Sequence, residues 1–206
     1  MRIAILTFEG FNEIDSLLAY SLLNRLKSQG WTAEIVSDRE EVTSMNGLTI
    51  KAHQSLSVLP EMDVVWFGSG TRTRDVAADA ELMSRLKVDP SRQLIAAQCS
   101  GTLLLAKLGL LGEVPACTDL TTKPWVVEAG AKVIDAPIFA RDSIATAGGC
   151  MASVYLATWL ICRQLGEEAA ARVLHYVAPV GEKEAYIAHA LAVVRPHVIR
   201  AAVPVA

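Results

Sequence analysis

One cysteine in this sequence stands where a nucleophile could be activated. Cys99 follows the apolar segment 92–98, which predicts a strand, and precedes residues 100–111, which suit a helix. The small side chains of Ser100 and Gly101 allow a sharp backbone turn, so the pattern is typical of a nucleophile elbow. The start of the following helix would place a partial positive charge near the sulfur, which predicts a lowered thiol pKa. The alternative is a buried structural cysteine at a strand end.

Backbone amides near Cys99 are a second candidate feature. The N–H of Ser100 could donate to an anion that develops at the site. Gly70 could supply a further N–H, because the strand predicted over 63–67 ends in a Gly-Ser-Gly turn and glycines let a ligand approach the backbone closely. Ser69, in the same turn, is a possible pocket residue. The alternative is a plain turn.

Asp15 could supply a proton to this chemistry. It follows the apolar segment 2–8, which predicts a buried first strand, and it lies among Ile14, Leu17 and Leu18. Apolar surroundings would raise its pKa and suit it to general acid catalysis. The alternative is a carboxylate that only complements the dipole of an early helix.

The other thiols and the imidazoles indicate no further chemistry. Cys117, Cys150 and Cys162 lie in apolar or small-residue settings and are interpreted as buried structural thiols. No Cys/His spacing matches a zinc site, so no metal site is expected. The histidines lie away from the predicted strand-end loops, which leaves no Ser/His/Asp arrangement. They are His53, His175, His189 and His197.

Strands alternate with helices along the chain, which predicts a mostly parallel sheet with helices on both faces. Strands are expected over 2–8, 31–37, 63–67 and 92–98, with short strands in 44–53 and 131–147. Helices are expected over 12–29, 75–87, 100–111, 121–129, 150–165, 167–176 and 182–202, the last ended or kinked by Pro196. Ligand sites form at the carboxyl ends of such strands, so the loops after three of them could share one pocket if the strands are neighbours.

Composition narrows the class of protein. The 206 residues are 52% hydrophobic and 20% charged, which predicts a single domain over 1–206. The net charge is -3 and no basic stripe occurs, which argues against a nucleic-acid partner. The apolar runs are too short to cross a membrane. The start does not match a signal peptide, so a cytoplasmic location is expected.

Four segments together resemble the DJ-one/ThiJ/PfpI superfamily, and within it the isonitrile hydratase-like branch. They are GFNEIDSLLAY, VVWFGSG, IAAQCSGTLLLAKLGLLG and TAGGCMASVYLATWLI, in that order. The resemblance implies a flavodoxin-like three-layer sandwich and usually a homodimer. It also implies that Cys99 is the nucleophile, that Asp15 lies against it, and that the amide of Gly70 faces the active site.

The sequence departs from the family pattern at Asp119. Many relatives have a histidine in the segment after the elbow helix, and Asp119 stands in its place. The change argues against a Cys–His dyad of the peptidase type and leaves a cysteine–carboxylate mechanism open. A nearby Asp119 carboxylate could also raise the pKa of Cys99 by charge repulsion.

The resemblance implies an isonitrile hydratase-like enzyme that acts on a small molecule without a cofactor. Cys99 would attack the isonitrile and Asp15 would deliver a proton, giving an N-substituted formamide. The alternatives are a non-catalytic redox or stress-response protein that senses oxidation through Cys99, and glyoxalase-like chemistry. The missing histidine is unfavourable for the glyoxalase alternative.

Overall fold

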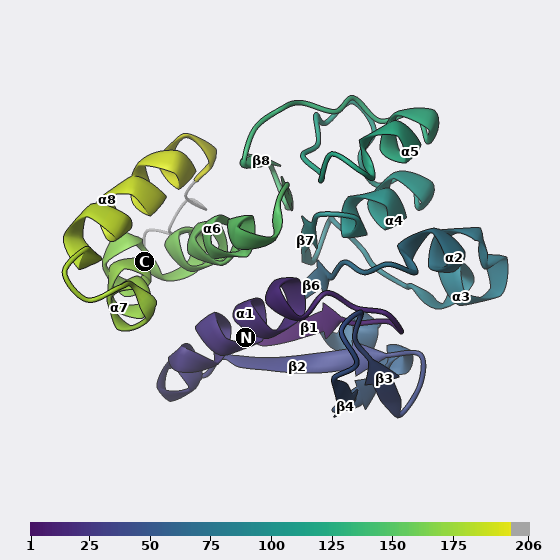
Figure 1. The fold of residues 1–206 in the computed structure, drawn as a ribbon, viewed down its shortest axis with the longest axis horizontal. Coiled ribbons are helices and arrows are strands. Elements are labelled where there is room, and N and C mark those ends of the chain that lie inside the picture. Colours follow the sequence, from purple (N-terminus) through teal and green to yellow (C-terminus); the bar gives the residue numbers. More distant parts are fainter. Residues whose placement is uncertain (199–206) are drawn as a thin grey trace.

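A computed structural model, which describes residues 1–198, contains one large sheet and a separate hairpin (Figure 1). The strands of the sheet are β1 (Arg2–Leu6), β2 (Thr32–Ser37), β5 (Gln54–Ser55), β6 (Val64–Phe67), β7 (Leu94–Gln98), β8 (Ile138–Arg141) and β9 (Ile144–Ala147). Their order is β5-β2-β1-β6-β7-β9-β8, and only the β8–β9 pair is antiparallel. The hairpin joins β3 (Glu41–Thr43) to β4 (Thr49–Lys51) around the expected turn at 46–47.

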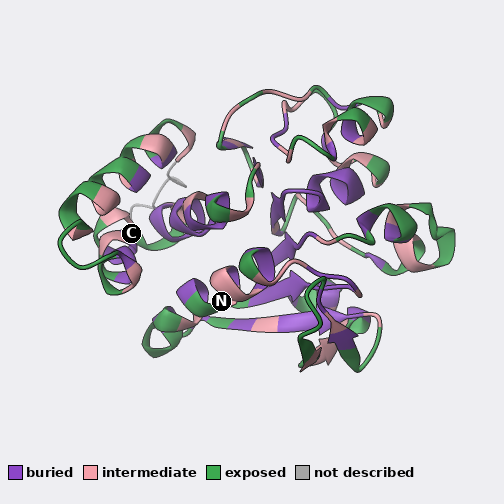
Figure 2. Cartoon of the chain, viewed as in Figure 1, coloured by how far each residue is buried: buried purple, intermediate pink, exposed green. Residues whose placement is uncertain are grey.

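Helices cover both faces of the sheet, as predicted. They are α1 (Glu13–Leu23), α2 (Thr73–Ala78), α3 (Ala80–Arg85), α4 (Gly101–Lys107), α5 (Lys123–Glu128), α6 (Ser153–Leu165), α7 (Glu167–Val177) and α8 (Lys183–Val194). One apolar cluster joins the sheet to α1, α6, α7 and α8, and a second joins it to α2, α3, α4 and α5. Side chains of β1 alternate between them: Ile3 and Ile5 enter the first, and Ala4 and Leu6 the second. Burial on both faces (Figure 2) explains why these strands are continuously apolar. The fold is the flavodoxin-like α/β arrangement that the sequence predicts.

The segment 75–87 was expected to form one helix, and the structure divides it into α2 and α3. Asp79 has extended backbone angles (φ -82°, ψ 97°), and its side chain accepts a hydrogen bond from the N–H of Leu82. An aspartate that caps the start of a new helix in this way cannot continue the previous one.

Two other helices end earlier than predicted. In the segment 100–111, α4 stops at Lys107, shortly before Gly109 takes a left-handed conformation (φ 71°). In the segment 12–29, α1 stops at Leu23 and a 3-10 helix follows.

The chain after α8 agrees with the prediction as far as the structure describes it. Pro196 lies in a short 3-10 turn directly after α8, so the α-helix ends there. The rest of the helix expected to 202 lies outside the described residues. Within residues 1–198, no helix has the length and apolar character needed to span a bilayer.

The sheet order brings the candidate loops together. β1, β6 and β7 are adjacent, so their carboxyl ends open at one edge of the sheet, as the prediction of a shared pocket required. β9 is the next parallel strand, and it adds a fourth loop, 148–150, to the same edge.

Gly101 lets the first residue of α4 pass directly over β6. A Cβ atom at this position would lie 2.4 Å from the carbonyl oxygen of Phe67 and 2.7 Å from that of Gly68. Both contacts are with backbone and are shorter than real Cβ contacts, so only glycine fits unless the strand or the helix moves.

We therefore expect Gly101→Ala to lower the free energy of unfolding by about 3 kcal/mol, because the overlap cannot be relieved by a side-chain rotation. Gly112→Ala is the matched control. Gly112 has a positive φ of 50° and open space around it, so that substitution should cost only about 1 kcal/mol. Urea unfolding of both variants measures the difference, and equal losses would contradict the role of the backbone crossing.

Candidate active site

Cys99 occupies the sharp turn between β7 and α4. Its φ is 47°, a left-handed conformation that costs a non-glycine residue energy. Two hydrogen bonds hold the turn: the Cys99 N–H donates to the carbonyl of Ala147 at 2.8 Å, and the Thr118 hydroxyl donates to the Cys99 carbonyl at 2.8 Å. The surrounding structure thus stabilises a strained elbow that aims the sulfur between the helices.

Asp15 reaches the same point from α1. Its side chain is completely buried, and Oδ2 accepts a hydrogen bond from the hydroxyl of Ser69. Oδ1 has no hydrogen-bond partner among the described residues. A buried carboxyl oxygen without a donor is costly as an anion, so this arrangement favours a protonated carboxyl.

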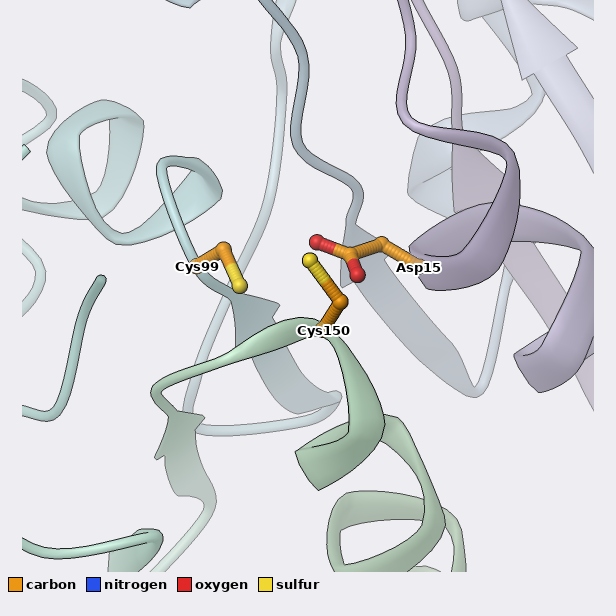
Figure 3. Close-up of side chains that lie close together, drawn as sticks. All are labelled: Asp15, Cys99 and Cys150. Carbon is orange, nitrogen blue, oxygen red and sulfur yellow. The ribbon is translucent and has the colours of Figure 1, made fainter. Parts of the chain in front are cut away.

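Cys150 completes a group of three side chains (Figure 3). It comes from the turn between β9 and α6, and its sulfur accepts a hydrogen bond from Nδ2 of Asn12 at 3.2 Å. The sulfurs of Cys99 and Cys150 and a carboxylate oxygen of Asp15 all lie within 4.8 Å of one another. The interpretation of Cys150 as a buried structural thiol is therefore wrong: it is half-buried and belongs to the site.

A cavity of about 430 Å³ opens beside Cys99. Its lining includes the predicted residues Ser69, Gly70, Ser100 and Asp119, with Asn12, Met45, Thr71, Thr73, Arg74, Thr121, Thr122, Trp125 and Cys150. Arg74 stacks on Trp125, with its guanidinium carbon 4.3 Å from the ring centre. The walls thus combine apolar surface with polar groups, as in small-molecule sites. Among residues 1–198, no histidine lines this cavity.

The predicted amide donor of Gly70 already has a partner. Its N–H donates to the hydroxyl oxygen of Ser100 at 3.1 Å. The hydroxyl oxygen of Thr73 lies 2.8 Å from the same Ser100 oxygen. In this arrangement the amide positions Ser100 and does not point its hydrogen at the cysteine. The N–H of Ser100, directly after Cys99, remains the predicted donor.

Asp119 lies in the cavity wall, in the segment just before α5. Its Oδ1 accepts a hydrogen bond from the N–H of Thr122 at 2.9 Å. Its negative charge contributes to raising the pKa of Asp15. The carboxylate that most affects Cys99 is therefore that of Asp15, and Asp119 acts on the pair indirectly.

Comparison with known proteins places this fold and cysteine elbow in a family. The family model described as the DJ-1/PfpI family matches residues 1–162. The chain belongs to the DJ-1/PfpI family. None of the curated proteins matches its sequence.

Solved structures of DJ-1/PfpI proteins share the fold at low sequence identity. A ThiJ/PfpI family protein from Pseudomonas syringae is 21% identical with a TM-score of 0.79, over 94% of this chain and 87% of that one. DJ-1 from Schizosaccharomyces pombe is 14% identical with a TM-score of 0.73, over 87% of this chain and 100% of that one. Oxidised DJ-1 from Toxoplasma gondii is 22% identical with a TM-score of 0.71, over 85% of this chain and 98% of that one. The shared fold does not determine the chemistry of this DJ-1/PfpI chain.

The electrostatics of the site reverse one prediction. Burial, and next the Asp15 carboxylate, raise the pKa of the Cys99 thiol, whereas the sequence predicted a lowered value. Burial also raises the pKa of Asp15. Loss of solvation in the buried pair outweighs the partial charge of the short helix α4. Ionising both the Cys99 thiol and the Asp15 carboxyl costs much free energy, so the two groups hold at least one proton between them.

The three side chains could also offer ligands to a metal ion, since two sulfurs and one oxygen lie within 4.8 Å. Thiol ligands must lose their protons to bind a metal. Burial raises the pKa of both Cys99 and Cys150, which opposes that loss. The absence of a metal or organic cofactor stays a prediction.

Sequence reasoning found the elbow and Asp15 but missed most of the cavity lining, including Cys150 and Asn12. Cys150 follows the glycine turn 148–149 at the end of a strand, and that signal could have placed it with the other strand-end loops. Asn12 could be found as the residue before α1, where an asparagine commonly caps a helix. Its second role, as a donor to sulfur, depends on the fold.

Removing the charge of Asp15 should lower the pKa of Cys99. In Asp15→Asn we expect the pH profile of Cys99 alkylation to move down by about 1 unit, because the carboxylate that repels the thiolate is gone. Burial remains, so the pKa should stay above the ordinary thiol value. Asp119→Asn should move the alkylation profile of Cys99 less, because the charge of Asp119 affects Cys99 only through Asp15. An unchanged or raised profile in Asp15→Asn would show that the two groups are not coupled.

The same substitution should stabilise the fold at neutral pH. Because folding raises the pKa of Asp15, its contribution to stability is full below about pH 4 and is lost as the pH rises through the higher folded pKa. The free energy of unfolding of Asp15→Asn should thus be higher than that of the wild type by about 1 kcal/mol at pH 7. The difference should be smaller at pH 4. Urea unfolding at both pH values measures this, and equal stability at pH 7 would refute it.

Proposed function

We propose that this chain is a cysteine-dependent enzyme that hydrates an isonitrile to an N-substituted formamide. One observation carries the proposal: the buried carboxyl of Asp15, with an unpartnered oxygen, lies beside the sulfur of Cys99. The terminal carbon of an isonitrile must receive first a nucleophile and then a proton. An adjacent thiol and carboxyl supply both at one atom.

The first step transfers one proton in two stages. Asp15 starts as the carboxylate and takes the proton of the Cys99 thiol, so the pair keeps one proton and a single negative charge. The sulfur then bonds to the terminal carbon, and Asp15 returns the proton to that carbon. The product is a thioimidate on Cys99, and Asp15 is again a carboxylate.

Water resolves the thioimidate in the second step. Asp15 accepts a proton as water bonds to the carbon, and this proton passes to the nitrogen. The hydroxyl of the adduct then gives its proton to Asp15 as the carbon–sulfur bond breaks. The formamide leaves, and Asp15 passes this proton to the Cys99 sulfur, so that both groups return to their starting protonation. We expect the N–H of Ser100 to stabilise the oxygen that becomes the carbonyl.

The cavity beside Cys99 suits a small organic substituent on the isonitrile. Met45 and Trp125 provide apolar contact, and the cavity of about 430 Å³ lies in the size range of small-molecule sites. Arg74 stacks on Trp125 and adds a polar group to the same wall. The substrate class is therefore a neutral isonitrile with a small to medium-sized apolar group.

A redox or stress-response function is the second candidate. The amide Nε2 of Gln98 lies 3.4 Å from the sulfur of Cys99, where it could donate to an oxygen of an oxidised sulfur. The glyoxalase-like alternative has less support, because no histidine lines the cavity in the described part of the chain. A homodimer and a cytoplasmic location remain proposals, the first testable by sedimentation.

Substitution of the pair tests the hydratase proposal. We expect Cys99→Ala to abolish formamide production and Asp15→Asn to lower kcat by about 10²-fold or more, since the proton donor is lost. Cys162→Ala is the control, because that buried thiol lies in α6 outside the cavity. Chromatographic assay of the formamide measures all three. Turnover that survives in Cys99→Ala would eliminate covalent catalysis by this thiol.

A further inference from the structure

A second thiol lies within reach of the nucleophile. Cys150 and Cys99 extend from the ends of neighbouring strands, β9 and β7, and their side chains point toward each other with Asp15 alongside (Figure 3). The two sulfurs are within 4.8 Å of each other. The hydration mechanism does not use Cys150, so it leaves the position of this thiol unexplained.

Asn12 fixes the orientation of the second thiol. Its Oδ1 accepts the N–H of Ile14 at 3.0 Å and so caps α1, which commits the other end of the amide to one direction. From there Nδ2 donates to the sulfur of Cys150 at 3.2 Å. A donor aimed at sulfur favours the negative charge that the sulfur carries when it attacks.

Cys150 is also the more accessible of the two thiols. It is half-buried, whereas Cys99 is buried. It lines the active-site cavity and also a second cavity of about 470 Å³, whose wall includes Tyr155 and His189. Cys150 therefore borders a second opening that Cys99 does not line.

We propose that Cys150 is the resolving thiol for Cys99, and that the chain reduces hydroperoxides with a dithiol through a reversible Cys99–Cys150 disulfide. This activity goes beyond isonitrile hydration and does not depend on it. It requires only the two thiols, the proton of Asp15, a hydroperoxide as oxidant and a dithiol as reductant.

The chemistry balances in three steps. The thiolate of Cys99 bonds to the terminal oxygen of the hydroperoxide, the O–O bond breaks, and Asp15 protonates the departing alkoxide to an alcohol. The sulfur of Cys150 then bonds to that of Cys99, and its proton leaves with the hydroxyl as water. Finally a dithiol reduces the disulfide and becomes a disulfide itself. Two electrons pass from the dithiol to the peroxide.

Closing the disulfide requires the sulfurs to approach to about 2.05 Å. Cys150 begins a three-residue 3-10 turn directly after Gly149, whose φ is 88°, and the next residue, Met151, is exposed. Such a surface turn can move more easily than the strained elbow of Cys99. Because Cys150 is already adjacent, resolution competes with a second peroxide molecule, which would be needed to form a sulfinate.

Intact mass and peptide mapping after treatment with hydrogen peroxide test the proposal. In the wild type we expect the loss of two hydrogen atoms, a linked pair of peptides containing Cys99 and Cys150, and full reversal by dithiothreitol. In Cys150→Ala we expect two oxygen atoms added to Cys99 and no reversal. Cys162→Ala, which removes a buried thiol outside the site, should behave like the wild type.

A turnover assay provides the second readout. Consumption of hydrogen peroxide with dithiothreitol should be lost in Cys99→Ser and in Cys150→Ala, and kept in Cys162→Ala. The peptide map of the wild type tests for the Cys99–Cys150 disulfide even if a variant fails to fold. A sulfinate on Cys99 without the linked peptides in the wild type, or a disulfide through any other cysteine, would overturn the proposal. Neither readout involves an isonitrile, so it can fail or succeed separately from hydration.

Discussion

The close crossing of backbones at the cysteine elbow is the constraint on which the site depends. Cys99 keeps its left-handed conformation (φ 47°) because its N–H bonds to β9 at Ala147 and because Gly101 lets α4 start against the carbonyls that follow β6. Three neighbouring strands are thereby tied to one residue. A strained conformation persists only where its surroundings over-determine it, and here the central sheet supplies those surroundings.

Burial then determines the chemistry that the elbow can do. Asp15 is completely shielded from solvent, and the sulfur of Cys99 is close to it, so each disfavours the ionisation of the other. This costs folding stability, as is common where a site needs an unusual protonation state. In return the pair holds a proton that can move from sulfur to carboxyl to substrate. In the proposed hydration, the thiol is therefore activated by a neighbouring base and not by a positive charge.

The same arrangement connects two reactivities that the family resemblance leaves open. A protonated carboxyl beside a sulfur serves equally for a carbon electrophile and for the oxygen of a peroxide. Asp119, at the position where the family resemblance led us to expect a histidine, adds a negative charge that raises the pKa of Asp15. Cys150 adds a second sulfur. The fold by itself selects none of these reactions, and the side chains at the strand ends do.

Much of this protein could be predicted from local pattern. The apolar runs and the glycines around Cys99 determine strands, helices and a sharp turn, because each depends on residues adjacent in the chain. Asp15 could be picked out for a similar reason, by its apolar neighbours. The tertiary structure alone decided that the thiol pKa rises and that Cys150 joins the site. Both depend on residues far apart in sequence that the strand order β1-β6-β7-β9 brings together in a space without solvent.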